Sequence, residues 1–207
     1  MNTEKVQKLT DVEQAVDAII ARVGKTIAIG LPLGLVKPVE LFNALLKVAP
    51  SDQSILLRIL TALSLEIPTG ASALEKNFLA PFIERVFGGV PELDYMKALR
   101  SNTLPKNIVV SEFFFKPGSL LNNKHAQEHY VSSNYSHAAR DVFNQGCNVA
   151  AQTICKRETD AGTRYSLSCN PHTTPELLEH LRTSGRPYVA IGMVNQRISG
   201  NLMSLGA

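Results

Sequence analysis

Residues 25–38, with the sequence KTIAIGLPLGLVKP, constrain the fold more than any other stretch of the chain. Residues 25–30 form a short apolar run that is partly β-branched, which is typical of a buried strand. The glycines and prolines that follow prevent a regular element from continuing: Gly30, Pro32, Gly34 and Pro38. The stretch therefore predicts a strand, a glycine- and proline-rich loop, and a helix whose first turn contains Pro38.

The loop between this strand and this helix is the first candidate binding segment. Apolar side chains recur after Pro38 at a spacing of three to four residues, which predicts a helix that packs back on the strand: Val39, Leu41, Phe42, Leu45, Leu46 and Val48. Open α/β sheets bind ligands at the carboxyl ends of parallel strands, where such a loop lies. A tight connection without any ligand would have the same pattern, because a lone glycine-rich loop is a weak motif.

Strand-like and helix-like segments alternate along the rest of the chain. Further strands are expected at residues 54–65, 107–115, 147–156, 164–169 and 187–194, with a polar turn at 158–162 joining two of them in a hairpin. Helices are expected at residues 10–24, in two parts of 124–146, and from Thr174 to a stop at Gly185. The pattern predicts an α/β fold, with a mainly parallel sheet flanked by helices and one antiparallel hairpin.

Residues 68–102 differ from the alternating pattern and predict an excursion from the sheet. Prolines and glycines, including Pro81, break this segment into short predicted helices. Phe78, Phe82 and Phe87 lie on these helices, and we expect the three rings to be buried against another surface. The excursion is therefore a candidate contact region.

Composition limits the classes of protein to which the chain can belong. At 207 residues and 44% hydrophobic content, the chain is expected to form one domain, residues 1–207. A net charge of +3 without a dense run of Lys or Arg argues against a nucleic-acid partner. The polar amino terminus, and an apolar tract interrupted by Arg58 and Glu66, argue against a signal peptide and a membrane span.

The cysteines point to a reducing compartment. Three are present without close spacing, which predicts neither a disulfide framework nor a zinc site: Cys147, Cys155 and Cys169. A cytoplasmic location is expected.

Two clusters contain residue types with catalytic or binding chemistry. His125, Glu128 and His129 spell the HxxEH pattern of inverted zinc peptidases. A match this short is frequent by chance, a third ligand must come from elsewhere, and a solvated helix face with paired polar groups explains the pattern as well. His137, Arg140 and Asp141 are expected on one helical face, where the acid could orient the imidazole and Arg140 could hold a carboxylate or phosphate. Composition alone favours a different interpretation of the second cluster, a capped surface helix with an ion pair.

Six blocks in order resemble the amino-terminal half of the acetyl-CoA hydrolase/transferase family, which includes 4-hydroxybutyrate and acetate CoA-transferases. They extend from about residue 27 to residue 195 and read GLPLGLVKPVELFNALLKVA, TALSLEIP, LPKNIVVSEFFFKPGSLL, AQEHYVSSNYSHAARD, GCNVAAQ and YSLSCNP. The resemblance implies a CoA-transferase (NagB/RpiA/CoA-transferase-like) fold of two α/β domains, with the acyl-CoA site between them. It also implies a function in acetate metabolism, in which a glutamate of the carboxyl-terminal domain attacks the thioester and later forms a glutamyl-CoA.

The resemblance implies a set of residues that bind substrate: Gly30, Leu31, Pro32, Leu33, Gly34, Asn134, Tyr135, His137, Arg140 and Asn195. It places the nucleophilic glutamate beyond Ala207, so no catalytic residue is assigned in this chain. The implied partners are an acyl-CoA, a small carboxylate and a carboxyl-terminal catalytic domain in cis or in trans. Coenzyme A enters as a thioester substrate, no tightly bound cofactor or metal is expected, and the chain is expected to form a homo-oligomer.

The chain also departs from the family pattern. Val36 stands where a glycine is usual in the loop, His172 where an acid is expected, and QRISGNLM follows Asn195 in place of the family's apolar run. These departures predict a truncated or altered end. The isolated 207-residue chain is expected to be enzymatically inactive, because the resemblance places the nucleophilic glutamate outside it. An alternative from another class is a non-catalytic α/β binding or structural domain, either a remnant or a subunit.

Overall fold

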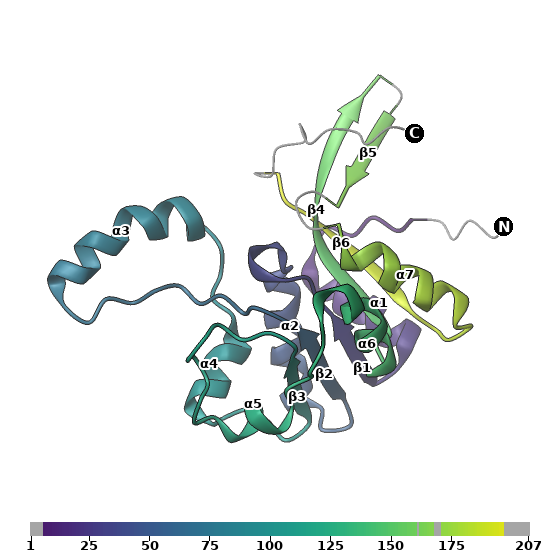
Figure 1. Ribbon diagram of the computed structural model, residues 1–207. Coiled ribbons are helices and arrows are strands. Elements are labelled where there is room, and N and C mark those ends of the chain that lie inside the picture. Colours follow the sequence, from purple (N-terminus) through teal and green to yellow (C-terminus); the bar gives the residue numbers. More distant parts are fainter. Residues whose placement is uncertain (1–5, 161, 168–170, 197–207) are drawn as a thin grey trace.

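Figure 1 shows a computed structural model in which residues 6–160, 162–167 and 171–196 are described. Their strands are β1 (Thr26–Gly30), β2 (Leu56–Thr61), β3 (Ile108–Glu112), β4 (Val149–Thr159), β5 (Gly162–Ser166) and β6 (Val189–Val194). The parallel part of the sheet has the order β3-β2-β1-β4-β6. β5 pairs antiparallel with the outer half of β4, and this hairpin projects from the body. The expected α/β fold with a mainly parallel sheet and one hairpin is confirmed.

Helices cover both faces of the sheet. The described helices are α1 (Val12–Val23), α2 (Val39–Ser51), α3 (Ala73–Phe87), α4 (Asp94–Ser101), α5 (Lys124–Glu128), α6 (Ala138–Asn144) and α7 (Thr173–Thr183), with the short 3₁₀ helices η1 (Gly34–Val36) and η2 (Tyr135–His137). α1, α2 and α4 share one hydrophobic core with the strands, and α6 and α7 share another. The parallel strands are therefore buried between two layers.

The two faces of β1 carry side chains of different size. Ile27 and Ile29 are buried in the core shared with α1 and α2. Ala28, the residue between them, is buried in the core with α6 and α7, and Gly30 continues this small-residue face. Because successive side chains of a strand point to opposite faces, the alternation lets α6 and α7 approach the sheet closely.

The excursion is present, but its predicted division into short helices at Pro81 is wrong. α3 is one helix of 15 residues with Pro81 inside it, and it begins with a capping box between Ser72 and Glu75. Proline removes one hydrogen bond, to the carbonyl of Asn77, and the exposed surface around this turn lets water replace it. Figure 1 shows α3 standing away from the body, and of its residues only Phe87 is buried.

Two smaller predictions need correction. The strand expected at residues 187–194 is shorter, β6, and its residues alternate between half-buried and exposed, because β4 is its one partner in the described sheet. The helix expected from residue 10 begins at Val12 and is capped by Asp11, whose Oδ1 accepts from the N–H groups of Glu13 and Gln14 at 2.7 and 3.2 Å. Among the described residues, no helix has the length and apolarity needed to cross a membrane.

Candidate functional site

A crevice lies where the strand order reverses. After β3 the chain crosses the sheet to the other side of β1, so the carboxyl ends of β1 and β4 form the topological switch point. These strands pair over only two positions, Ile29 with Val149 and Gly30 with Ala150. A cavity of about 20 Å³, the size of a single water molecule, opens just beyond this pairing. The expectation that the loop after Gly30 lies at the carboxyl end of a parallel strand is confirmed.

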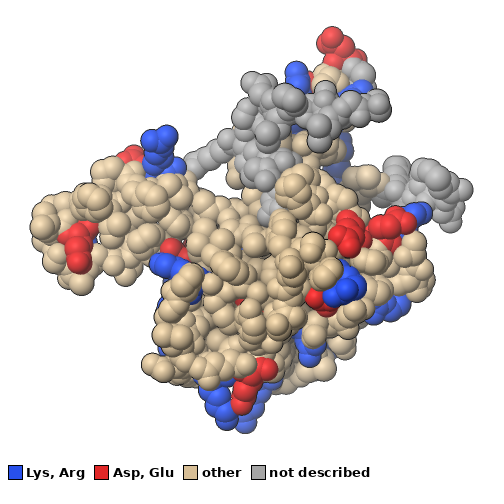
Figure 2. All heavy atoms as spheres, in the orientation of Figure 1, with Lys and Arg blue, Asp and Glu red and all other residues tan. Residues whose placement is uncertain are grey.

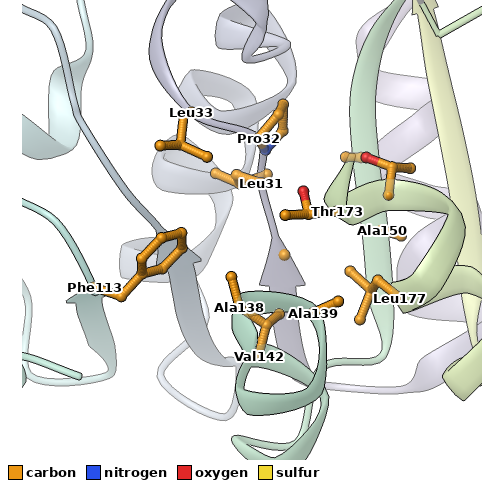
Figure 3. A pocket seen from close by; sticks show the side chains of 13 residues that line it. Leu31, Pro32, Leu33, Phe113, Ala138, Ala139, Val142, Ala150, Thr173 and Leu177 are labelled. Atoms are coloured by element: carbon orange, nitrogen blue, oxygen red, sulfur yellow. The ribbon is translucent and has the colours of Figure 1, made fainter. Parts of the chain in front are cut away.

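Apolar groups make up most of the lining of this crevice (Figure 3). Leu31, Pro32 and Leu33 come from the loop, Phe113 follows β3, and the other walls come from α6, α7 and β4. They include Ala138, Ala139, Val142, Ala150 and Leu177. The polar side chains of the lining are Thr173 and Thr174, in the first turn of α7, and Thr174 donates its hydroxyl to Gln152 Oε1. No titratable side chain of the described residues lines the crevice, so it can bind by shape and backbone polarity but supplies no acid or base.

Gly30 is required by packing at the base of the crevice. A Cβ at this position would lie 2.9 Å from Cys147 Sγ, 3.0 Å from Val142 Cγ1 and 3.1 Å from Leu177 Cδ2. Such distances are too short for a methyl group in a close-packed interior. The glycine therefore sets how closely α6 and α7 approach β1.

Gly34 has a different role, because its φ is +64° and a Cβ would have room, with Leu65 Cδ1 at 3.9 Å. Its N–H donates to the carbonyl of Leu63 at 3.2 Å. Leu63 is itself strained, with φ +47° in a non-glycine residue. Both residues of this hydrogen bond, Gly34 and Leu63, thus have a positive φ, and this unusual backbone conformation fixes the loop. Gly34 itself lies outside the lining of the crevice.

Lys37 stabilises this strained region from inside the protein. Its side chain is buried, and its Nζ donates to the carbonyl oxygens of Ala62 at 2.7 Å and Leu63 at 3.3 Å. Burial lowers the pKa of Lys37 from 10.5 to about 7, and the charge of Glu112 only partly opposes this shift. The ammonium holds the carboxyl end of β2 against the loop.

Glu112, at the end of β3, belongs to the same buried polar cluster. Its Oε2 accepts from the N–H of Ser64 at 3.4 Å, and its Oε1 has no hydrogen-bond partner among the described residues. Burial raises the pKa of Glu112, while the Ser64 hydrogen bond and the Lys37 charge oppose the rise. Burial likewise raises the pKa of Tyr95, whose hydroxyl is 2.5 Å from Ser64 Oγ.

This cluster was missed in the sequence analysis. A charged residue inside the apolar run NIVVSEFFF, and a lysine in the loop between Val36 and Pro38, are the signals that could have indicated it. Val36, the residue that departs from the family pattern, is buried in η1.

The second predicted cluster lies beside the crevice but does not line it. Asn134 caps η2 by accepting from the N–H of Ser136, and Tyr135 lies against His172 with ring centroids 6.3 Å apart. The expected arrangement of His137 on one face of a helix with its partners is not formed, because His137 ends η2 and precedes α6.

Asp141 does not orient His137 through a hydrogen bond. Its Oδ1 accepts from Arg140 Nε at 2.9 Å, and its Oδ2 accepts from Ser133 Oγ at 2.6 Å. Both partners hold the pKa of Asp141 below its usual value, with the Arg140 hydrogen bond as the larger cause. Asn195 is separate from this group, at the end of β6, where its N–H donates to the carbonyl of Ile154.

The HxxEH residues do not have the geometry of a zinc site. α5 ends at Glu128, and His125 Nε2 accepts a hydrogen bond from the N–H of Val110 at 3.1 Å. That nitrogen is therefore not free to bind a metal, although the rings of His125 and His129 are close, with centroids 4.4 Å apart. The described residues contain no group of three potential metal ligands.

No family model matches the chain, and no curated protein matches it. A solved structure described as "Crystal Structure of RipA from Yersinia pestis" is similar, with 14% sequence identity and a TM-score of 0.47. The similarity covers 97% of this chain and 45% of that one, so this chain spans about half of its length.

Proposed function

We propose that the chain is the amino-terminal α/β half of an acetyl-CoA hydrolase or CoA-transferase, and that its crevice holds the acyl end of an acyl-CoA thioester. The proposal rests on one observation, which is the position of the sequence blocks that resemble the acetyl-CoA hydrolase/transferase family. GLPLGLVKP begins at the last residue of β1 and continues through the loop, LPKNIVVSEFFF contains β3, and GCNVAAQ leads into β4. Parts of all three blocks line the crevice at the switch point. The apolar lining suits a short acyl chain, and the enclosed cavity, about the size of one water molecule, has room for little more than the terminal methyl group of that chain.

The chemistry proposed for this chain is positioning. Leu31 to Leu33 and Phe113 would exclude water from the acyl group, and Thr173 could donate a hydrogen bond at the rim. The nucleophilic carboxylate would come from a second domain, in cis or in trans, and attack the thioester carbonyl as the CoA thiolate leaves. A carboxylate acceptor would give transfer and water would give hydrolysis.

Binding of acetyl-CoA to the isolated chain tests the proposal. Titration calorimetry with the wild-type chain should show saturable binding at up to millimolar ligand. Thr173→Tyr should weaken this binding by at least about tenfold by filling the rim of the crevice. Thr183→Tyr, at the exposed other end of α7, is the matched control and should bind like wild type. Absence of binding, or equal binding by both variants, overturns the proposal.

The second candidate, a non-catalytic binding or structural domain, is favoured by one observation: the described lining contains no acid or base, so nothing in it activates the hydroxyls of Thr173 and Thr174. The two candidates differ in what a second domain would do. Adding a glutamate-bearing carboxyl-terminal domain should start release of CoA from acetyl-CoA if the chain is half of an enzyme. Binding that never leads to turnover in that mixture would support the non-catalytic candidate.

A further inference from the structure

Helix α3 carries a stripe of exposed apolar side chains. Leu74, Phe78 and Phe82 follow one another at a spacing of four residues and are 80%, 81% and 49% exposed. The opposite side of the helix lines an open hollow with residues 68–70, and Phe87 anchors the carboxyl-terminal end. On the face shown in Figure 2, the projecting arm carries only scattered charges. The three rings were expected to be buried against another surface; in the described chain Phe87 is buried, whereas Phe78 and Phe82 are exposed.

We propose that α3 is a dimerisation arm, which pairs antiparallel with α3 of a second copy of this chain around a two-fold axis at the height of Ala80. At 100° per residue, Glu75, Phe78, Phe82 and Arg85 fall within a sector of about 80° on the outer face. The two-fold axis places each residue of one helix opposite the residue of the second copy that lies the same number of positions on the other side of Ala80. Phe78 then meets Phe82 of the second copy, and Glu75 meets Arg85 of the second copy.

Charge complementarity selects this arrangement and its direction. Arg85 is exposed and forms no ion pair with any described residue, and Glu75 uses only its Oε2 in the capping box. The antiparallel pair brings Glu75 and Arg85 together twice, whereas a parallel pair in register would set each charge against its own kind. The same helix face is therefore complementary to itself in one direction only.

The size of the surface predicts a weak dimer. An aromatic side chain has a surface of about 150–250 Å². Multiplied by the exposed fractions of Phe78 and Phe82, this gives on the order of 250 Å² of exposed ring surface per copy. Even with Leu74 and the flanking charges, the interface falls at or below the small end of specific interfaces. Phe87 holds the carboxyl-terminal end of each arm to its own body, so the two bodies lie at opposite ends of the helix pair and do not collide.

Sedimentation equilibrium of the whole chain from low to high micromolar concentration tests the proposal. Wild type should show a reversible monomer–dimer equilibrium, and Phe78→Ser should weaken it by at least about tenfold by removing a central ring. Leu121→Ser is the matched control, because Leu121 is 71% exposed and lies outside α3. Circular dichroism checks that each variant keeps its helix content.

Charge reversal tests the direction of pairing. Arg85→Glu alone and Glu75→Arg alone should each weaken self-association, because like charges then meet twice. A mixture of the two variants should form a heterodimer, in which every pair is again of opposite charge. The proposal is overturned if the wild-type chain is monomeric, which is the result expected if α3 binds a different kind of partner. So does a dimer that ignores Phe78→Ser, or a mixture that associates no better than either variant alone.

Discussion

The Nζ of Lys37 donates a hydrogen bond of 2.7 Å to the carbonyl oxygen of Ala62, and both residues are buried at the end of β2. This hydrogen bond connects the residue just before Pro38, the N-cap of α2, to the end of β2, the strand that pairs with β1. It also places an amino group in an environment that disfavours its charge. The loop that borders the crevice is thus supported by a group whose protonation changes near neutral pH.

The stability of the protein should rise with pH above neutrality because of Lys37. Its pKa is about 7 in the folded chain and 10.5 when exposed, so the unfolded chain binds more protons between these values. The free energy of unfolding should increase there by up to about 1.4 kcal/mol per pH unit. Lys37→Met should reduce this slope, as measured by urea unfolding at pH 7 to 10. Lys47→Met, which removes an exposed lysine of α2, should keep it.

Glu112 should act in the opposite direction at acid pH. Its pKa is raised from 4.5 by burial, so the folded chain holds a proton that the unfolded chain has lost. The contribution of Glu112 to the free energy of unfolding is present below pH 4.5, and it is lost as the pH rises through the pKa that Glu112 has in the folded chain. Glu112→Gln should flatten the fall in unfolding free energy above pH 4.5, and Glu40→Gln, on the surface of α2, serves as the control. An unchanged profile in Glu112→Gln would contradict the assignment.

Gly30→Ala should destabilise the fold by about 1–3 kcal/mol, because the new methyl group overlaps Cys147, Val142 and Leu177. Cys147→Ala in the same chain should recover part of this loss by removing the nearest atom. A double-mutant cycle in chemical denaturation measures the coupling between the two positions. Additive effects would show that Gly30 is not limited by this contact.

Substitutions at Gly34 should follow backbone conformation and not side-chain volume. A Cβ has room there, but the φ of +64° is strained for a branched side chain. Gly34→Val should therefore lose more stability than Gly34→Asn, by about 1 kcal/mol or more in thermal or urea unfolding. If the two variants are equally stable, the strain argument fails.

The isolated chain should release no CoA from acetyl-CoA. The described residues that line the crevice include no base to activate the hydroxyl of Thr173 or Thr174, so the crevice can orient a thioester but is not expected to attack it. A thiol-reagent assay with pure protein, compared with a buffer blank, measures this directly. Sustained release of CoA above the blank would contradict this prediction and would show that the chain has a catalytic group of its own.

Local patterns were sufficient to predict most of the secondary structure. The apolar runs gave the central strands, and the polar turn at 158–162 gave the β4–β5 hairpin. The glycines and prolines after residue 29 gave the loop. These features are local, because strand burial, turns and helix stops depend on neighbouring residues. The position of the loop at the carboxyl end of β1 followed from the α/β pattern and a known property of such sheets.

The tertiary structure alone decided what surrounds the loop. Lys37 and Glu112 are 75 positions apart in the numbering and share one buried cluster only because β2 lies between their elements. The separation of Asn195 from the crevice likewise depends on strand order, which no local pattern specifies. Pro81 was expected to end a helix, but the exposure of α3 lets water replace the missing hydrogen bond. Local sequence thus determined the elements, and long-range packing determined which charges are buried together and which rings remain exposed.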